Sequence, residues 1–386
     1  MKKLQFWSIV NDQTTGPKSI QREISAFEKE TKIKVECTEF PWGKAWYYLI
    51  NSIKEDNKPD VVQIGNSWVS TLAEIGFLDD ITDILYNKKT QEQFYHISPE
   101  IGKRYFAFPW ILDIGLLFVR KNELTSNYVI DTFDDLLTLC KKSKSKSLFA
   151  MGGTHENILI QYMSNFIWGF DGKYVRKNSI DLLDENNFQG IKAFFDLIDR
   201  YGMKKMLLDI YGHIMWDFFL KGKGLFTLTN AWVINAFIKE HKKKNEFMAM
   251  VIPGNEKKAP YMGGSCLGMV KGTKKMKESI SLVNFLTSFQ SQKRYLTATG
   301  QLPARKDVMH QIIDNYVYKE AILKSLKVAR IYPAVPYWGS FENILLEFIN
   351  LILSMIANNI YNEKHLRDEV QLVNSKIKTV IQLWER

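Results

Sequence analysis

The sequence predicts a two-domain α/β protein whose chain begins with a doubly wound parallel sheet. Two observations lead to this prediction. The chain has 386 residues, which is more than a single hydrophobic core usually serves. Its first 65 residues alternate between strand-like and helix-like hydrophobic patterns, as the units of a parallel α/β sheet do.

The first units follow one another closely. Alternating apolar residues predict a strand over 4–10, and apolar residues at helical spacing from Ile20 to Phe27 predict a helix. A second strand is expected over 33–41, a helix over 45–55 and a buried strand over 61–65. This order is βαβαβ, which predicts parallel strands joined by right-handed crossovers.

Later strands are less regular. The stretch from Tyr105 to Arg120 is expected to form two extended segments joined at Pro109 and Trp110. Further strands are expected over 222–232, 248–254 and 261–270, the last of them rich in glycine. Apolar stripes at helical spacing then predict three helices, whose core-facing residues are Ile280, Val283, Leu286 and Phe289; Phe341, Leu345, Phe348 and Ile352; and Leu366, Val370, Val373, Ile377 and Ile381.

Ligands of open α/β sheets bind outside the carboxyl ends of the strands. The polar and aromatic residues that follow the first three strands are therefore candidate ligand contacts: Asn11, Asp12, Trp42, Asn66, Ser67 and Trp68. Asp113 is isolated among apolar residues, where a carboxylate is unfavourable unless it is paired or faces a cleft.

Composition narrows the class of ligand. Aromatic residues make up 13% of the chain, which suggests that some rings line a recognition surface. The net charge of +10 could indicate nucleic acid, but the basic runs 141–146 and 242–244 contain no aromatic residues. They are interpreted as solvated surface, and no nucleic-acid partner is predicted.

Cysteines and apolar runs indicate neither a disulfide framework nor a membrane span. Cys37, Cys140 and Cys266 are far apart in the chain and odd in number. The N-terminal apolar run is interrupted by Gln5 and Ser8 and is interpreted as a strand rather than a signal peptide. The apolar stretch 344–356 is too short to cross a bilayer, so the chain as given is expected to be soluble.

No catalytic motif is recognisable. The string at 264–268 places Ser and Cys in the wrong positions for G-x-S-x-G, and 268–274 lacks the spacing of a P-loop. The six histidines are scattered without H-E-x-x-H, and no pair among the 42 acidic residues has a distinctive context. The sequence therefore leaves an enzyme possible but unsupported, and it indicates neither a metal site nor a cofactor.

Six strings, taken in order and at their spacing, resemble one protein family: FEKETKIKVECTEFPW (27–42), PDVVQIGNSWVSTLAEIGFLDDITD (59–83), FPWILDIGLLFVRKNEL (108–124), GKGLFTLTNAW (222–232), PG…YMGGSCLGMVKGTK (253–274) and FLTSFQSQKRYLTATGQLPARK (285–306). They resemble the family 1 extracellular solute-binding proteins of bacterial ABC importers, the group that includes maltose-binding protein. The resemblance covers almost the whole chain.

The resemblance implies a periplasmic-binding-protein-like fold, with two doubly wound α/β lobes joined by a hinge of several crossovers. The expected N-lobe consists of 1–111 and 264–304, and the expected C-lobe of 112–263 and 305–386. In this family the lobes close around a ligand, and the closed form is presented to membrane permease subunits.

The implied function is capture of a sugar or oligosaccharide between the lobes, without catalysis, by a monomer. The implied location is the extracellular or periplasmic face of the bacterial membrane, with a lipid anchor in the full-length protein. Neither a signal segment nor an anchoring cysteine precedes Leu4 in this chain.

By position, the resemblance also implies the ligand contacts. They are polar side chains, aromatic platforms and glycines: Asn11, Asp12, Asn66, Trp68, Asp113, His155, Glu156, Trp232, Gly263, Gly264, Tyr337 and Trp338, to which the strand-end rule adds Trp42. Flat rings suit the apolar face of a pyranose, while carboxylates and amides suit its hydroxyl groups.

Two alternatives remain open. The net charge, with Arg104, Arg305 and Arg330, would also suit an anionic, uronate-containing oligosaccharide on the same fold. The abundance of aromatic residues and carboxylates would suit a carbohydrate-active enzyme, although no motif supports that class.

Overall fold

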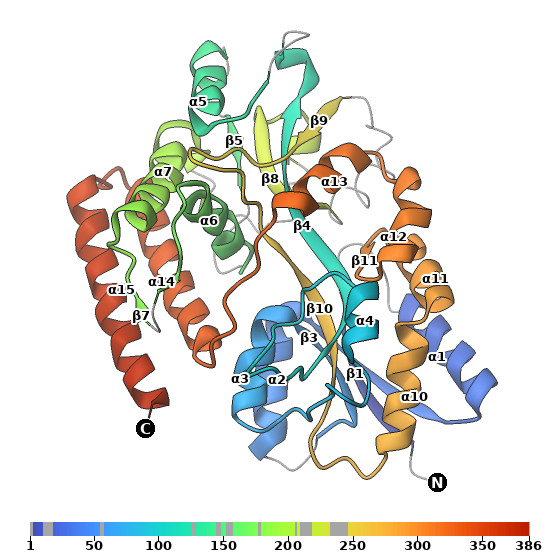
Figure 1. Cartoon of the computed structure of the whole chain (residues 1–386). Helices are drawn as coiled ribbons and strands as arrows, with labels where there is room; N and C mark the ends of the chain where they lie inside the picture. Colours follow the sequence, from blue (N-terminus) through green and yellow to red (C-terminus); the bar gives the residue numbers. More distant parts are fainter. Residues whose placement is uncertain are drawn as a thin grey trace.

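The computed structural model describes residues 3–10, 18–54, 58–124, 129–143, 148–151, 157–176, 179–204, 207–208, 218–231 and 246–385. Its main feature is a nine-stranded sheet in the order β2-β1-β3-β10-β4-β8-β5, to which β9 and β11 add through β4. Helices flank both ends of this sheet (Figure 1). The α/β architecture predicted from the sequence is confirmed.

The strands of the sheet are β1 (Leu4–Val10), β2 (Val35–Pro41), β3 (Val61–Gly65), β4 (Phe108–Arg120), β5 (Phe149–Ala150), β8 (Phe226–Asn230), β9 (Phe247–Met250), β10 (Met262–Met269) and β11 (Leu302–Pro303). A separate two-stranded sheet consists of β6 (Val175–Arg176) and β7 (Ser179–Ile180).

The helices of the first half and of the junction are α1 (Lys18–Thr31), α2 (Trp42–Lys54), α3 (Val69–Glu74), α4 (Lys88–Gln93), α10 (Met276–Leu286), α11 (Phe289–Thr299), α12 (Lys306–Ile312) and α13 (Lys319–Val328). Those of the second half are α5 (Phe133–Lys142), α6 (Ile158–Gly169), α7 (Glu185–Tyr201), α14 (Trp338–Ala357) and α15 (Glu363–Trp384). The described residues also include the 3-10 turns η1 (Asn66–Trp68), η2 (Lys121–Glu123) and η4 (Ile313–Asn315).

The βαβαβ start is confirmed. Strand β1 pairs in parallel with both β2 and β3, while α1 buries Ile20, Ile24 and Phe27. The alternation read from the sequence arises because one face of β1 lies on this core. The carboxyl ends of β1, β2 and β3 consequently lie at one edge of the sheet.

Strand β10 joins the parallel strands to the second half of the sheet. It pairs antiparallel with β3 on one side and with β4 on the other. The buried Gln63 side chain links three strands, since it accepts hydrogen bonds from Ser8 Oγ (3.0 Å) and Ile9 N (2.8 Å) and donates one to Ser265 Oγ (3.0 Å). These bonds specify how the three strands are aligned, because a shift would leave a buried amide unpaired.

The prediction of two extended segments between Tyr105 and Arg120 is wrong. The structure has one continuous strand, β4, of 13 residues. Its pairing with β10 shifts so that Ser265 faces Ile111 and Cys266 faces Pro109, which leaves Trp110 as an extra residue. Proline has no N–H to donate, and a bulge accommodates it without ending the strand.

The prediction of one helical stripe from Ile280 to Phe289 is also wrong. Helix α10 ends at Leu286, and α11 begins at Phe289. The Ser288 hydroxyl accepts a hydrogen bond from the Ser291 N–H, as an N-cap does, so a new helix starts there. Apolar spacing continued across the break, and the cap was the missed signal.

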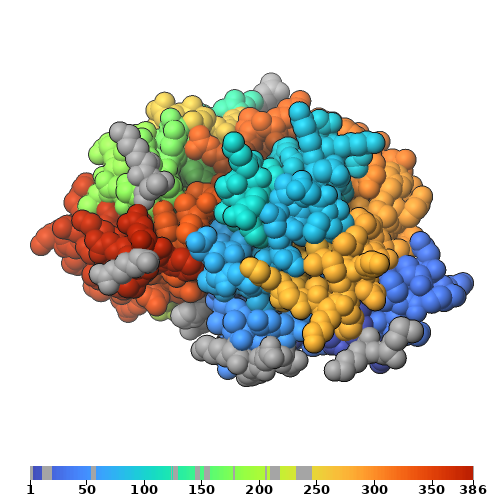
Figure 2. Space-filling model, turned by 60° about the horizontal axis from the view of Figure 1, so that its bottom comes forward, coloured from blue at the N-terminus to red at the C-terminus, as the bar shows by residue number. Residues whose placement is uncertain are grey.

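Buried apolar residues form two clusters, one at each end of the sheet. Val308 of α12 and Ile322 of α13 belong to the first cluster, and α13 packs against β4 and β9. The second cluster gathers α5, α6, α7, α14 and α15. Figure 2 shows the red C-terminal helices on one side of the molecule and the blue N-terminal segments on the other. The lobe boundaries after 111, 263 and 304 remain predictions.

Helix α14 is the one described helix whose length and apolar composition would allow it to cross a membrane, with a mean hydropathy of 1.5. In the fold it is a core helix. Phe341, Leu345 and Phe348 are buried, and the helix packs against α6, α7 and α15. This burial explains why the segment is so apolar without any need for a bilayer.

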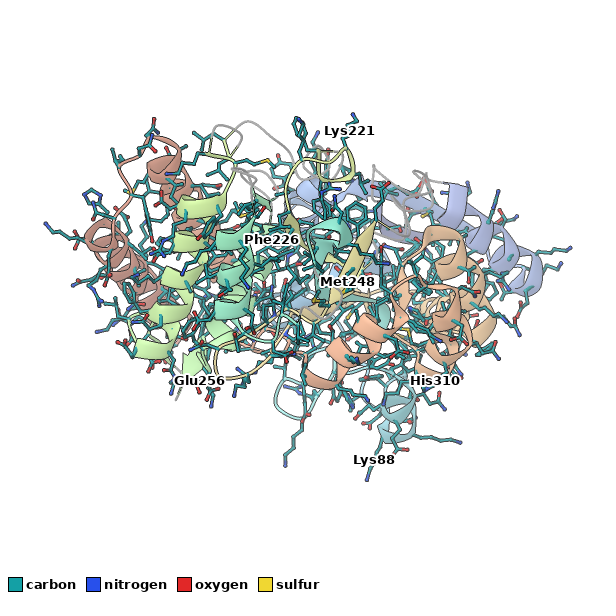
Figure 3. The ribbon with its side chains drawn as sticks, turned by 90° about the horizontal axis from the view of Figure 1, so that it is seen from above. Lys88, Lys221, Phe226, Met248, Glu256 and His310 are labelled. Carbon is teal, nitrogen blue, oxygen red and sulfur yellow. The ribbon has the colours of Figure 1, made fainter. Side chains whose placement is uncertain are left out.

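Seen from above, the second half of the sheet lies near the middle of the molecule. Figure 3 places Phe226 of β8 and Met248 of β9 there, while Lys88, His310 and Glu256 lie at the periphery. Strand β8 lies within the range 222–232 that the sequence predicted to be extended, and it is buried over its whole length.

Asp60, which directly precedes β3, connects separate segments of the chain in the first half of the molecule, so its replacement tests what holds this half together. Its carboxylate accepts hydrogen bonds from Gln5 N (2.8 Å), Thr273 Oγ1 (2.6 Å) and Lys275 Nζ (2.9 Å). Burial acts to raise the pKa of Asp60, but these bonds outweigh it and lower the pKa below its usual 3.8. The carboxylate therefore stabilises the fold above about pH 4, and this contribution is lost as pH falls through the lowered pKa.

We expect Asp60→Asn to lower the free energy of unfolding by about 1.5–3 kcal/mol at neutral pH, because a charge-assisted set of bonds is lost. The difference from the wild type should shrink below about pH 4. Urea denaturation at several pH values measures it. Asp314→Asn, at an exposed pair with Lys319, is the control and should change stability by less than about 1 kcal/mol. A loss that stays constant down to pH 3 would contradict this role.

Candidate functional site

The end of β3 brings Asn66 and Trp68 into the interior. Both residues belong to η1, which starts directly after Gly65, and both are buried. A side chain at Gly65 would touch the rings of Trp42 and Trp68, at 3.4 Å and 3.5 Å. The glycine thus lets the chain turn while these two rings lie against its backbone.

Three tryptophans form a cluster beside this turn. The Trp68 ring lies 5.6 Å from Trp42 and 5.3 Å from Trp46, centroid to centroid. Trp42 is 38% exposed, whereas Trp68 is only 6% exposed. The predicted contacts Trp42 and Trp68 therefore lie together, with one ring open to solvent and the other inside. Trp46 is half-buried between Trp68 and α14.

The isolated carboxylate of β4 is paired within the sheet. Asp113 Oδ2 accepts a hydrogen bond from Asn230 Nδ2 (2.5 Å), and Asp113 Oδ1 accepts one from Ile114 N (3.0 Å). Asn230 Nδ2 also donates to Gln161 Oε1 at 2.9 Å. The pairing of Gly115 with Asn230 across β4 and β8 puts both side chains on one face.

Asn230 and Gln161 were not among the predicted site residues. Asn230 ends a strand just before Trp232, so its position at a strand end was the available signal. Gln161 lies on α6, and only the position of α6 beside the sheet brings it to Asn230, which in turn bonds Asp113.

The predicted glycines lie opposite the same carboxylate. Gly263 pairs directly with Asp113 across β10 and β4. A Cβ at Gly263 would lie 1.9 Å from the Tyr261 hydroxyl and 2.9 Å from Asn66 Oδ1. Gly264 has a φ of +135°, and its Cβ would lie 1.9 Å from the Ile111 carbonyl oxygen. At both positions a side chain would collide with neighbouring protein atoms, so glycine is needed there for packing alone, independently of any ligand.

Tyr261 connects the first half of the molecule to α6. Its hydroxyl donates to Asn66 Oδ1 at 3.4 Å, and its N–H donates to Asn165 Oδ1 at 2.7 Å. Its side chain is fully buried, and this burial raises its pKa well above the usual value, with the charges of Asp113 and Glu342 adding to the effect. Tyr261 therefore stays neutral and acts as a hydrogen-bonding group.

Tyr337 and Trp338, the predicted aromatic platforms, lie at the start of α14. Both rings are buried in the conformation described. The Trp338 ring packs against Tyr332 (4.6 Å between centroids), Tyr174 (5.3 Å) and Phe341 (5.3 Å). Its role as a platform remains a prediction.

A seam of polar contacts links η1 and α3 to the start of α14. Thr71 Oγ1 donates to the Pro336 carbonyl oxygen (2.8 Å) and accepts from Gly339 N (3.3 Å). Ser67 Oγ donates to Glu342 Oε2 at 3.3 Å. Neither Thr71 nor Glu342 was a predicted site residue, because nothing in the local sequence indicates a partner more than 260 positions away.

Glu342 is the titratable group of this seam. The residue is 6% exposed. Burial raises the pKa of its carboxyl to about 7, although the Trp338 indole and the Ser67 hydroxyl act in the opposite direction. The indole itself makes no hydrogen bond of ordinary geometry, so Ser67 is the firmer of the two contacts.

Five of the predicted ligand contacts lie outside the described residues: Asn11, Asp12, His155, Glu156 and Trp232. The other eight fall into two groups. One surrounds β3, β4 and β10, and the other is the start of α14. The contacts of Ser67 and Thr71 link these groups.

Within the described ranges, no three His, Cys, Asp or Glu side chains form a group that could hold a metal ion. The three cysteines are free thiols. Burial raises the pKa of Cys37 and of Cys140 to about 12, so neither is a ready nucleophile at neutral pH.

The arginines that suggested an anionic ligand have acidic partners in the chain. Arg305 Nε bonds Asp307 Oδ1 at 2.8 Å, Arg330 Nη2 lies 3.4 Å from Asp171 Oδ1, and Arg104 Nε lies 3.9 Å from Asp80 Oδ2. These contacts provide a structural reason for each arginine without a ligand.

Comparison with known proteins agrees with this geometry. Residues 24–319 match the family of bacterial extracellular solute-binding proteins. The diacetylchitobiose binding protein DasA of Streptomyces coelicolor is 22% identical over 337 residues, covering 82% of this chain and 77% of that protein. A maltooligosaccharide ABC transporter solute-binding lipoprotein of Streptococcus pneumoniae is 21% identical over 354 residues, covering 87% and 82%.

The fold is shared with solved structures. Maltose-bound MalE3 of T. maritima superposes with a TM-score of 0.82 at 18% identity, covering 97% of this chain and 99% of that one. The chain belongs to the bacterial extracellular solute-binding protein family, as the resemblance of its sequence indicated. Both curated relatives are named as binding proteins.

The glycine at the crossing of β10 and β4 gives a test. We expect Gly264→Ala to destabilise the protein by at least about 2 kcal/mol, because a Cβ would meet the Ile111 carbonyl in a backbone conformation that L residues rarely adopt. Gly43→Ala, in α2 with open space around it, should be neutral or stabilising by up to about 1 kcal/mol. Chemical denaturation measures the free energy of unfolding of both variants, and equal stability of the two would show that Gly264 is not needed for packing.

Proposed function

We propose that this protein captures a sugar or oligosaccharide in a cleft between two lobes and delivers it to the membrane permease of an ABC importer. The observation that carries the proposal is that β10 pairs on one side with the end of β3, where the tryptophan cluster lies, and on the other with Asp113 of the Asp113–Asn230–Gln161 network. Rings suit the apolar face of a pyranose, and the amides and carboxylate suit its hydroxyl groups.

The relatives support this class of ligand. One is named for diacetylchitobiose and another for maltooligosaccharides, and MalE3 was solved with maltose. The shared family supports an extracellular location, and the name of the pneumococcal relative supports a lipid anchor. We propose further that the protein acts as a monomer without catalysis, and that its halves, 1–111 with 264–304 and 112–263 with 305–386, close around the ligand.

The ligand contacts are proposed as predicted: Asn11, Asp12, Trp42, Asn66, Trp68, Asp113, His155, Glu156, Trp232, Gly263, Gly264, Tyr337 and Trp338. To these we add Asn230 and Gln161, which hydrogen-bond as a unit with Asp113. A ligand hydroxyl that bonds Asp113 would join a network whose amides are already oriented, which reduces the entropic cost of binding.

A thermal-shift screen against mono- and oligosaccharides tests the function directly. A binding sugar should raise the melting temperature, because it binds the native state alone. Asp113→Asn should lower the affinity for that sugar by roughly 10- to 100-fold, because about 1.5–3 kcal/mol of hydrogen bonding to a charged group is lost. Asp368→Asn, on exposed α15, is the control and should bind like the wild type. No shift with any glycan would contradict the proposal.

An anionic oligosaccharide is the second candidate, and the net charge of +10 is the observation that favours it. Attraction between a cationic protein and an anionic sugar weakens as salt screens it. For a neutral sugar we expect the affinity to change less than about twofold between roughly 50 and 500 mM salt. Titration calorimetry at both salt concentrations measures this, and a much larger loss would favour the anionic ligand.

A further inference from the structure

The seam between η1, α3 and the start of α14 joins parts of the chain that belong to different halves of the molecule. Ser67 and Thr71 extend from β3, whereas Pro336, Gly339 and Glu342 belong to the second core or its entrance. Figure 2 agrees, since red-orange C-terminal atoms border blue N-terminal ones there. Any motion that separates the halves at this place must break these contacts.

Two of the contacts are insensitive to pH. Thr71 bonds a backbone carbonyl and a backbone N–H, and Trp46 lies 3.6 Å from where a Cβ of Gly339 would be. The third contact is different because it involves a carboxyl group. Glu342 is enclosed once Ser67 lies against it, and water that would solvate an ionised carboxylate is then excluded.

The surroundings of Glu342 do not compensate a negative charge. Among the described residues that act on it, the titratable ones are Tyr174, Tyr261 and Tyr332, which burial keeps neutral. Its polar neighbours are Ser67 from η1 and the Trp338 indole from its own helix, and no described Lys, Arg or His acts on it. A buried acid in such surroundings is favoured as the neutral carboxylic acid.

We propose that Glu342 is a positioning residue of ligand capture, whose carboxyl takes up a proton when the two halves of the molecule close on each other. The proposal rests on the proposed function, because it assumes that the halves open and close. In the open form the carboxyl is in contact with water and ionises at an ordinary pH. In the closed form its pKa is about 7, so closure between these values binds a proton.

The direction of the effect follows from linkage. Since the closed form binds more protons than the open form, a rise in pH favours opening. Closure should therefore be most favourable below about pH 4.5, weaken as the pH rises to about 7, and change little above that value. We expect ligand affinity to fall roughly tenfold between pH 5.5 and pH 8.5.

The experiment measures closure without any ligand. The radius of gyration of the ligand-free protein is followed by small-angle X-ray scattering from pH 5.5 to 8.5. The wild type should expand with a midpoint below about pH 7. Glu342→Gln, which mimics the neutral acid, should stay compact throughout. Glu347→Gln changes an exposed carboxyl on the same helix and should behave like the wild type.

Two further variants keep the test valid if Glu342→Gln folds poorly. Ser67→Ala removes the hydroxyl that stabilises the ionised carboxylate in the seam, so it should make the protein more open at high pH and leave its dimensions at low pH unchanged. Thr71→Val should favour opening at every pH and leave a pH dependence in place. Wild-type dimensions that do not change with pH, or a Glu342→Gln variant with the wild-type midpoint, would overturn the proposal.

Failure of this proposal is distinguishable from failure of the proposed function. If a glycan binds with an affinity that does not depend on pH, and the dimensions are also constant, only the role of Glu342 is refuted. If no glycan binds, the scattering experiment still reports whether protonation of Glu342 closes the halves.

Discussion

The rest of the structure depends on the burial of β4 along its whole length. This strand pairs with β10, β11, β8 and β9, and so belongs to both ends of the sheet. A strand covered on both faces has room for apolar side chains only, and between its ends β4 makes a single polar exception at Asp113. That carboxylate must then find its hydrogen-bond partners inside the molecule. Asn230, one strand away, and Gln161 behind it form a polar site in the middle of an apolar sheet.

The same constraint explains the glycines beside this site. Strand β10 crosses β4 so closely that Gly264 would place a Cβ on the Ile111 carbonyl, and Gly263 leaves room for the Tyr261 hydroxyl. Tyr261 is thereby held between Asn66 and Asn165, which belong to different parts of the sheet and its helices. The polar side chains are consequently positioned before any ligand arrives, as a pre-organised binding site requires.

Contacts between the halves have a different character from contacts inside each core. Within each core, apolar side chains pack without direction, whereas the seam at Thr71 and Glu342 consists of a few directed hydrogen bonds. Each such hydrogen bond contributes about 1 kcal/mol net, so the proposed opening of the halves at this seam would cost only a few kcal/mol, which the binding of a ligand can offset.

The sequence by itself determined the βαβαβ start, the amphipathic helices α14 and α15, the family and the strand-end position of Asn66 and Trp68, because these follow from local periodicity and order. The predictions for β4 and for the segment of α10 and α11 were wrong. A bulge lets β4 continue as one strand, and a serine cap divides the predicted single helix into two. Only the tertiary structure brought Gln161 to Asn230 and Glu342 to Ser67. Partners so distant in the chain are chosen by how helices dock on the sheet, and no local pattern encodes that docking.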